Sequence, residues 1–164
     1  MSTKFNSGDA RVSGVEVNAR HSLRKLGTWG RHITLFANAT RLWLEGNPFG
    51  SFESFVPKSA NWGFSFVWQR LTIQPKWNYR GLNKLTAVPA FGPDGFIYIK
   101  ARTLLDVNAA YRLTPRLSLS LSFSNVFDKH LTQMRYGSET PDYAKRSLDS
   151  AYGTAFALGL RGTF

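Results

Sequence analysis

The sequence predicts an all-β protein, an antiparallel meander of about seven membrane-spanning strands. Three observations support this fold class. Apolar and polar residues alternate with a period of two, the alternating stretches are roughly 9–13 residues long, and short connections alternate with long ones. A tilted strand needs about 9–11 residues to cross a bilayer, whereas the mean strand of a soluble protein has about 5–6.

The stretch 117–127 shows the period most clearly. Odd positions from Leu117 to Phe123 are apolar, and even positions from Ser118 to Ser124 are all serine. Successive strand side chains point to opposite faces, so this stretch has one apolar and one polar face. The same alternation predicts strands over six further stretches: 14–23, 32–40, 60–68, 71–80, 105–113 and 152–164.

The first two of these strands carry small and branched apolar residues. In 14–23 the apolar face starts at Val15 and carries His21 near its end, and in 32–40 it starts at Ile33. Phe36 falls among the polar set of the second strand. Both stretches therefore read as strands with one solvated face.

The middle strands are richer in aromatic residues. In 60–68 the aromatic residues alternate with Asn61, Gly63 and Ser65. In 71–80 Pro75 falls on the apolar face, and because proline has no N–H for the ladder we expect a local bulge there. In 105–113 odd positions are apolar and lie opposite Asp106 and its even-numbered neighbours.

The connections alternate in length along the whole chain. The short ones cover 26–30, 68–70 and 114–116, and the long ones cover 45–57, 81–100 and 128–150. Short periplasmic turns and long extracellular loops are typical of an outer-membrane barrel. A soluble β-sandwich, the plainest alternative, has no reason to keep this rhythm.

Composition excludes several classes of protein. The chain has 164 residues, no Cys and a formal net charge of +11, and none of its apolar runs approaches the ~20 residues of a membrane-spanning helix. Zero Cys excludes a disulfide scaffold and thiolate metal sites. The basic excess alone suggests nucleic acid or an anionic membrane surface as a partner.

Basic and aromatic side chains sit mostly at strand ends. The basic residues beside the short turns are Arg24, Lys25, Arg31, Arg70 and Arg116. Those in or beside the long loops are Lys58, Lys84, Lys100, Arg102, Lys129, Arg135, Lys145 and Arg146. The aromatic residues that favour two membrane girdles are Trp29, Trp43, Trp62, Trp68, Trp77, Tyr79, Tyr111, Tyr152 and Phe164.

Several motifs resemble the last third of TonB-dependent receptors. They are 14–16 (GVE), 56–61 (VPKSAN), 77–81 (WNYRG) and 125–129 (NVFDK). The C-terminal stretch is similar to the insertion signal of outer-membrane proteins, with Gly162 in one expected apolar slot. The residues of that signal are Tyr152, Phe156, Leu158, Leu160 and Phe164.

The resemblance implies a 22-stranded barrel in the bacterial outer membrane, inserted by the barrel assembly machinery and filled by an N-terminal plug domain. Such receptors take up a scarce nutrient, of the siderophore, cobalamin or oligosaccharide class, with energy from the TonB complex. Residues 1–14 lack the apolar core of a secretory signal peptide. We therefore expect 1–164 to be the C-terminal segment of the barrel, lacking the plug domain, its TonB contact and the earlier strands, and not functional alone.

The polar strand face is the candidate surface for ligand or plug contact. Its members are Arg20, Asn38, Lys76, Asn78, Arg80, Asp106, Asn108 and Arg161. The plainer interpretation is that these residues fill the barrel wall. The candidates for ligand contact from the extracellular loops are Phe91, Phe96, Tyr98, Tyr136 and Tyr143. Loop lysines and arginines also suit the phosphates of outer-membrane lipid and lipopolysaccharide.

No catalytic constellation stands out, so we expect no enzyme and no cofactor. The three histidines, His21, His32 and His130, have no metal-ligand spacing. Two alternatives stay open: a small self-contained barrel with a structural or adhesion role, and a soluble basic module that binds nucleic acid. The first needs an eighth strand from 1–12, which has few apolar residues, and the second needs one basic face rather than charge at both rims.

Overall fold

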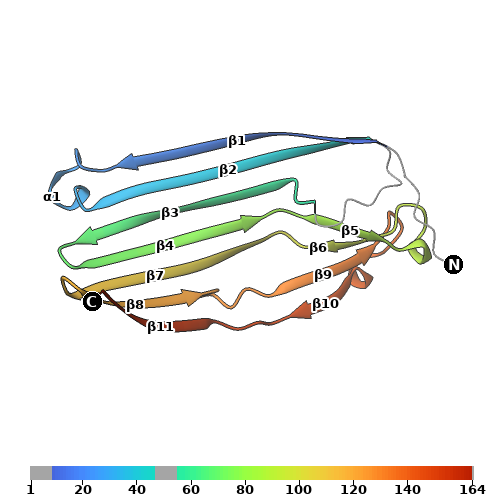
Figure 1. Cartoon of the computed structure of the whole chain (residues 1–164). Coiled ribbons are helices and arrows are strands. Elements are labelled where there is room, and N and C mark those ends of the chain that lie inside the picture. The colour runs from blue at the N-terminus through green and yellow to red at the C-terminus, as the bar shows by residue number, and fades with distance from the viewer. Residues whose placement is uncertain (1–8, 47–54, 164) are drawn as a thin grey trace.

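A computed structural model describes residues 9–46 and 55–163, which form a long curved sheet continued at one end by a smaller sheet (Figure 1). The large sheet has seven strands in the order β1-β2-β3-β4-β7-β8-β11, each antiparallel to its neighbours. The strands are β1 (Ala10–Ser22), β2 (Ile33–Gly46), β3 (Lys58–Trp68), β4 (Leu71–Arg80), β7 (Arg102–Thr114), β8 (Leu117–Ser124) and β11 (Ala155–Gly162). The seven predicted strands are confirmed, with ends that differ by a few residues.

The short connections all lie at one end of the large sheet, on the left in Figure 1. One of them holds the short helix α1 (Gly27–Gly30), and only Gln69 and Arg70 separate β3 from β4. Strand β11 runs toward this end, while β1 starts at the opposite end. Among the described residues, no helix is long and apolar enough to cross a membrane.

The smaller sheet was not predicted. It has the order β10-β9-β6-β5 and consists of β5 (Asn83–Ala87), β6 (Phe96–Ile99), β9 (Leu131–Tyr136) and β10 (Arg146–Ser150). The 3₁₀ turns η1 (Pro89–Phe91) and η2 (Asp142–Ala144) lie in its connections. Both segments expected to be long loops, 81–100 and 128–150, therefore fold into hairpins that prolong four strands of the large sheet.

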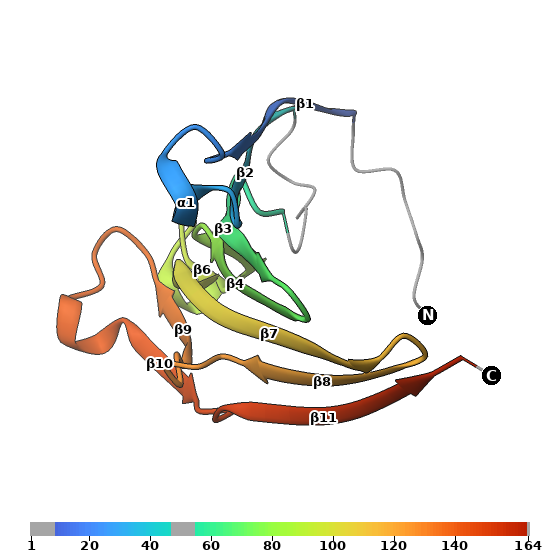
Figure 2. The ribbon, with the colours of Figure 1, turned by 90° about the vertical axis from the view of Figure 1, so that its left-hand side faces the viewer.

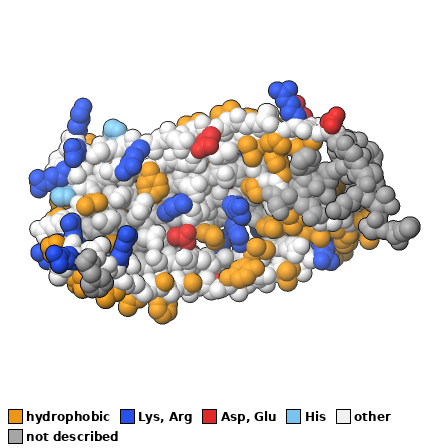
Figure 3. Space-filling view, in the orientation of Figure 1, with side chains coloured by type: hydrophobic (Ala, Val, Ile, Leu, Met, Phe, Trp, Pro, Cys, Tyr) orange, Lys and Arg blue, Asp and Glu red, His pale blue; other side chains and the backbone are white. Residues whose placement is uncertain are grey.

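The large sheet is an open arc when viewed along its strands (Figure 2). The concave face, which Figure 3 views directly, carries the charged side chains of the strand interiors. The convex face carries the apolar side chains of the alternating pattern, including Trp62, Phe64 and Phe66 of β3. Not every aromatic residue lies at a rim, because Trp62 and Trp77 face each other within β3 and β4.

The prediction of a bulge at Pro75 is wrong. The pairs on either side, Gly63 with Lys76 and Phe66 with Ile73, keep one register, although no pairing is formed between them. Pro75 also pairs in register with Val107 on its other side. The missing N–H therefore interrupts one ladder without shifting either strand.

Gly63 explains why Phe36 lies on the polar face. The two residues are directly opposite each other in β2 and β3, and a Cβ on Gly63 would lie 2.8 Å from Phe36 Cζ and 2.2 Å from the Pro75 carbonyl oxygen. The phenylalanine ring thus covers the glycine, an arrangement that shields glycine backbone within sheets.

The described chain has almost no core. Leu105 and Pro75 are its buried apolar side chains, and no described side chain is fully buried. Large apolar residues on the convex face stay exposed, among them Phe156 at 75% and Leu158 at 68%. A soluble sheet of this size would bury such residues against a second layer, so the convex face requires an apolar environment.

Candidate functional site

The concave face carries two hydrogen-bonded polar groups that span neighbouring strands. Asn38 Nδ2 lies 2.6 Å from Asn18 Oδ1 and 2.7 Å from Glu16 Oε1, which joins β2 to β1. Asn78 Nδ2 donates to Asp106 Oδ2 at 2.7 Å, and Asp106 Oδ1 accepts from the Asn125 backbone N–H at 3.0 Å. These bonds tie predicted site residues into the wall itself.

The other predicted concave-face residues are spread along the sheet. Asn108 accepts from Ser122 Oγ at 2.8 Å, and Lys76 lies directly opposite Asp106. Arg20 lies near the short-turn end with Arg24 and Arg31 around a groove, and Arg161 sits on the last strand opposite Ser118. The eight predicted residues therefore share a face but do not form one site.

A group of cations that we call the concave basic strip gathers where the two sheets meet. Its members are Lys76, Arg80, Lys84, Lys100 and Arg102. Arg80 and Arg102 are directly opposite each other, and the pairs Asn83–Ile99 and Lys84–Tyr98 continue that register. Residues 81–82 and 100–101 lie between the paired strands, and beyond them the same register resumes, so the five cations follow one another along the chain from β4 and β7 into β5 and β6.

Three aromatic rings extend the strip. The Tyr98 and Tyr136 rings stack with centroids 4.3 Å apart, and Phe96 meets Tyr98 edge-on at 6.4 Å. Lys84 Nζ lies 3.4 Å from the Phe96 centroid, and Lys145 Nζ lies 5.3 Å from that of Tyr136. Burial, followed by the charges of Tyr136 and Asp94, raises the pKa of Tyr98.

Two of the predicted loop aromatics stay apart from this cluster. Phe91 lies in η1 and Tyr143 in η2, and Tyr143 is 90% exposed. The structure therefore brings together Phe96, Tyr98 and Tyr136 from the five residues predicted in the loops.

A depression of about 590 Å³ lies beside the strip on β9 and β10. Its wall includes Lys100, Lys129, His130, Arg146 and Asp149. Asp149 accepts hydrogen bonds from His130 Nδ1 at 2.9 Å and Thr132 Oγ1 at 2.8 Å and also pairs with Arg146. These bonds, that of His130 first, lower the pKa of Asp149 from 3.8 to about 2.

Sequence reasoning missed this depression because its residues are far apart in the chain. Nothing in the spacing of His130 and Asp149 predicts their contact, since it depends on the β9–β10 register. The described residues hold no group of three or more His, Cys, Asp or Glu side chains suited to a metal ion.

The predicted insertion signal lies on the last strand. Phe156, Leu158 and Leu160 share the convex face of β11, whose register pairs them with Phe123, Leu121 and Leu119 of β8. Tyr152 precedes the strand and is 71% exposed, while Phe164 lies outside the described residues. β11 has no partner on its outer edge within the described sheet.

Several solved structures share this fold. The ferric citrate transporter FecA in its unliganded form has a TM-score of 0.69 and 17% identity, over 94% of this chain and 24% of that one. The copper transporter OprC has a TM-score of 0.68 and 21% identity, over 96% and 23%. FpvAI in complex with pyocin S2 has a TM-score of 0.61 and 17% identity, over 94% and 19%.

The chain thus spans about a quarter or less of the structures it resembles, and identities this low show the fold alone. No curated protein matches the sequence. A family model described as "TonB dependent receptor-like, beta-barrel" matches residues 2–126, well over half of the chain. The chain therefore belongs to the TonB-dependent receptor β-barrel family.

Proposed function

We propose that this chain is the C-terminal part of the barrel of an outer-membrane receptor that imports a scarce nutrient with energy from the TonB complex. The observation that carries the proposal is the division of seven membrane-length strands into a convex apolar face and a concave polar face. This is the division between lipid and lumen in a transmembrane barrel.

The open sheet supports the proposal that this chain is part of a barrel rather than a complete barrel. β1 and β11 are both edge strands of the large sheet, which does not close on itself. Lipid does not tolerate unpaired strand edges. A small self-contained barrel would pair these two edges, and the arc in Figure 2 leaves them far apart. The remaining strands and the plug domain are thus expected partners in the complete receptor, and the barrel assembly machinery is expected to insert it.

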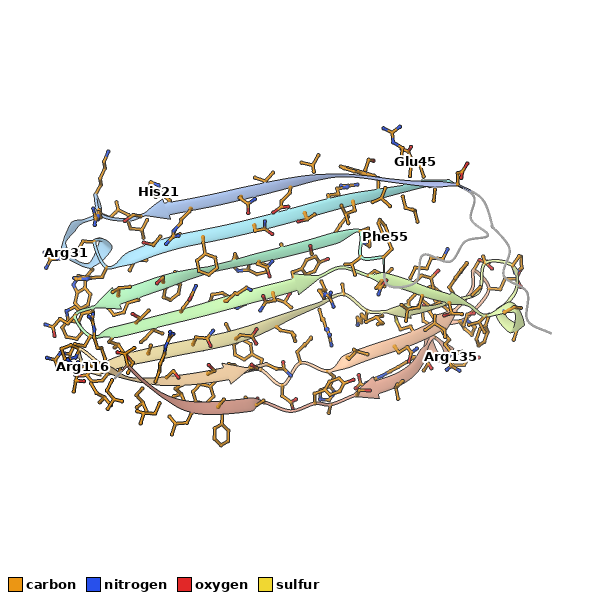
Figure 4. The ribbon with its side chains drawn as sticks, in the orientation of Figure 1. His21, Arg31, Glu45, Phe55, Arg116 and Arg135 are labelled. Atoms are coloured by element: carbon orange, nitrogen blue, oxygen red, sulfur yellow. The ribbon has the colours of Figure 1, made fainter. Side chains whose placement is uncertain are left out.

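The short-turn end is the periplasmic end in this proposal, and the smaller sheet is extracellular. Figure 4 places Arg31 and Arg116 at the first end and Glu45 and Arg135 at the second. Incoming nutrient would then meet the concave basic strip and its aromatic rings before anything deeper in the barrel.

The strip favours one of the three expected nutrient classes. Five cations in the neighbouring segments 76–84 and 100–102, with Asp106 the acidic residue among them, attract an anion and repel a cation. Cobalamin and neutral oligosaccharides gain little from such a field. We therefore favour an anionic siderophore chelate, whose planar groups suit the stacked tyrosines.

Uptake assays with the complete receptor that carries this segment test the proposal. Radioactive iron bound to an anionic catecholate siderophore, cobalamin and a maltodextrin are offered to cells with and without TonB. We expect TonB-dependent uptake of the iron chelate, reduced by K84Q/R102Q and unaffected by K25Q in the short turn. Uptake that is equal with and without TonB contradicts the proposal. Import of cobalamin or maltodextrin alone contradicts the choice of nutrient.

A further inference from the structure

The short-turn end of the large sheet is strongly basic. Four stretches of chain reach it, 20–34, 66–73, 111–119 and 160–163, and none of them contains an aspartate or a glutamate. Their basic residues, a group that we call the basic rim, are Arg20, Arg24, Lys25, Arg31, Arg70, Arg112, Arg116 and Arg161. Figure 3 shows blue side chains and no red ones at this end of the concave face. The rim therefore accounts for most of the net charge of +11.

The described residues supply no counter-charge to the basic rim. All of their ion pairs lie within 128–149, at the other end of the molecule. Glu16 and Asp106 are the acidic residues closest to the rim along β1 and β7, and each already accepts a hydrogen bond from an asparagine, Asn38 and Asn78 respectively. Like charges gathered at one end of a sheet repel one another, so an anionic partner would stabilise them.

The basic rim lies on the concave face and in the turns rather than on the convex face. The register places Arg112 and Arg161 opposite Ser118, on the concave face that Arg20 shares. The other members lie in the connections, and Figure 4 places Arg31 and Arg116 at the very end of the sheet. A groove of about 480 Å³ opens among them, lined by Arg20, Ser22, Arg24, Arg31 and Thr34. Lipid against the convex face is therefore on the wrong side of the sheet for this groove.

The connection between β1 and β2 enlarges the basic rim. It spans 23–32, whereas only two residues join β3 to β4 and only two join β7 to β8. Its helix α1 presents Trp29, and Leu26 precedes that helix; the two residues are 76% and 72% exposed. A flat apolar ring beside guanidinium groups suits a ligand that combines sugar rings with acidic groups.

We propose that the basic rim binds the carboxylate groups of peptidoglycan, with 23–32 as its main contact. The inference rests on the proposed function, which places this end of the sheet in the periplasm, where peptidoglycan is an extended carboxylate-bearing polymer. All members of the rim except Lys25 are arginines, whose planar fork binds a carboxylate through two hydrogen bonds. Because the rim follows the whole seven-stranded sheet, a polymer with many carboxylates neutralises it better than one compact ligand. A plug domain would reach only the arginines that face the lumen.

Co-sedimentation of the complete receptor, in detergent, with purified insoluble peptidoglycan tests the inference. We expect R24Q/R31Q/R116Q to weaken binding roughly tenfold, since each exposed ion pair contributes about twofold. The matched control R11Q/R41Q/R135Q removes three arginines toward the opposite end and should bind like the original receptor. R24K/R31K/R116K keeps the charge and should bind more tightly than the glutamine variant, while heat-modifiable migration on gels verifies that every variant is folded.

The chemistry of the partner is tested with peptidoglycan whose carboxylates have been converted to amides. It should bind the original receptor as weakly as untreated peptidoglycan binds R24Q/R31Q/R116Q. Undiminished binding to the amidated polymer overturns the inference, as does equal binding of untreated peptidoglycan to the original receptor and R24Q/R31Q/R116Q.

Two cellular measurements separate this inference from its alternatives. If R24Q/R31Q/R116Q makes cells sensitive to vancomycin while peptidoglycan binding is unchanged, these arginines hold the plug domain and the inference is wrong. Nutrient uptake that is equal with and without TonB refutes the proposed function itself. TonB-dependent uptake together with unaltered peptidoglycan binding by R24Q/R31Q/R116Q refutes the peptidoglycan contact alone.

Discussion

The strands of the smaller sheet prolong four strands of the large sheet, but the two sheets are held together differently. In the large sheet the ladders are long and five of the six keep a constant register, with one shift between Arg112 and Thr114, and the structure shows no ion pair there among the described residues. In the smaller sheet the strands are short, and two of its three pairings shift register. Its segments hold all four ion pairs of the described chain, between Asp128 and Asp149, and the stacked tyrosines.

This difference indicates which interactions stabilise each sheet. In the proposed barrel, lipid covers the apolar face of the large sheet and supplies what a core would supply in a soluble protein. In the same proposal the smaller sheet lies beyond the apolar band, so its own contacts must hold it together in water. One example is the bond from the Ser138 backbone N–H to Asp94 Oδ2, at 2.7 Å, which joins its two hairpin tips.

The largest effect is expected from placing a charge on the apolar convex face of the large sheet. Leu121 lies on the convex face at the middle of β8, and L121R should destabilise the barrel by about 2–4 kcal/mol, the cost of arginine at the bilayer midplane. S120R, one residue earlier on the concave face, is the matched control. Unfolding in urea, followed by heat-modifiable migration, measures both; equal effects would contradict the assignment of the faces.

A smaller loss is expected where two backbones approach closely. G63A places a methyl group 2.2 Å from the Pro75 carbonyl oxygen, so β3 and β4 must shift apart. Overpacking of this kind costs about 1–3 kcal/mol. S65A, on the same face of β3, removes only a hydroxyl and should be near neutral in the same unfolding assay. A neutral G63A would mean that the two strands are less closely spaced.

The contrast between the sheets also explains what the sequence could predict. Alternation over 117–124 or 71–80 reflects two different environments on the two faces of a strand, so it is visible in the residues themselves. β6 reads Phe-Ile-Tyr-Ile with no polar alternation, and β9 and β10 each contain a basic residue on a short strand, so no such pattern marks them. The concave basic strip was partly visible as Lys76 and Arg80, but Lys84, Lys100 and Arg102 join it only through the register of a hairpin.

Acid should loosen the smaller sheet before the large one. The pKa of Asp149 is lowered from 3.8 to about 2, so the bonds from His130, Thr132 and Arg146 stabilise β9 and β10 above pH 3.8 and are lost as the pH falls toward 2. Pepsin, which is active in this range, should cleave within 128–150 increasingly as the pH falls, while the large sheet stays intact. D149N should be cleaved there at a rate that changes little with pH. Equal pH dependence in D149N would contradict the role of this carboxylate.

The smallest effects are expected at two residues with the same positive φ, one within the large sheet and one where the smaller sheet begins. Gln69, in the turn between β3 and β4, and Asn125, where β8 gives way to the smaller sheet, have φ values of +51° and +54°. Glycine adopts this conformation without steric cost, so Q69G should stabilise the barrel by about 0.5–1 kcal/mol. N125G should instead destabilise it by about 1 kcal/mol, because the Asn125 amide donates to the Gly153 carbonyl at 3.1 Å and accepts from the Lys129 N–H at 2.8 Å. Urea unfolding of both variants measures the signs; if N125G were also stabilising, these side-chain bonds would contribute less than the backbone strain they accompany.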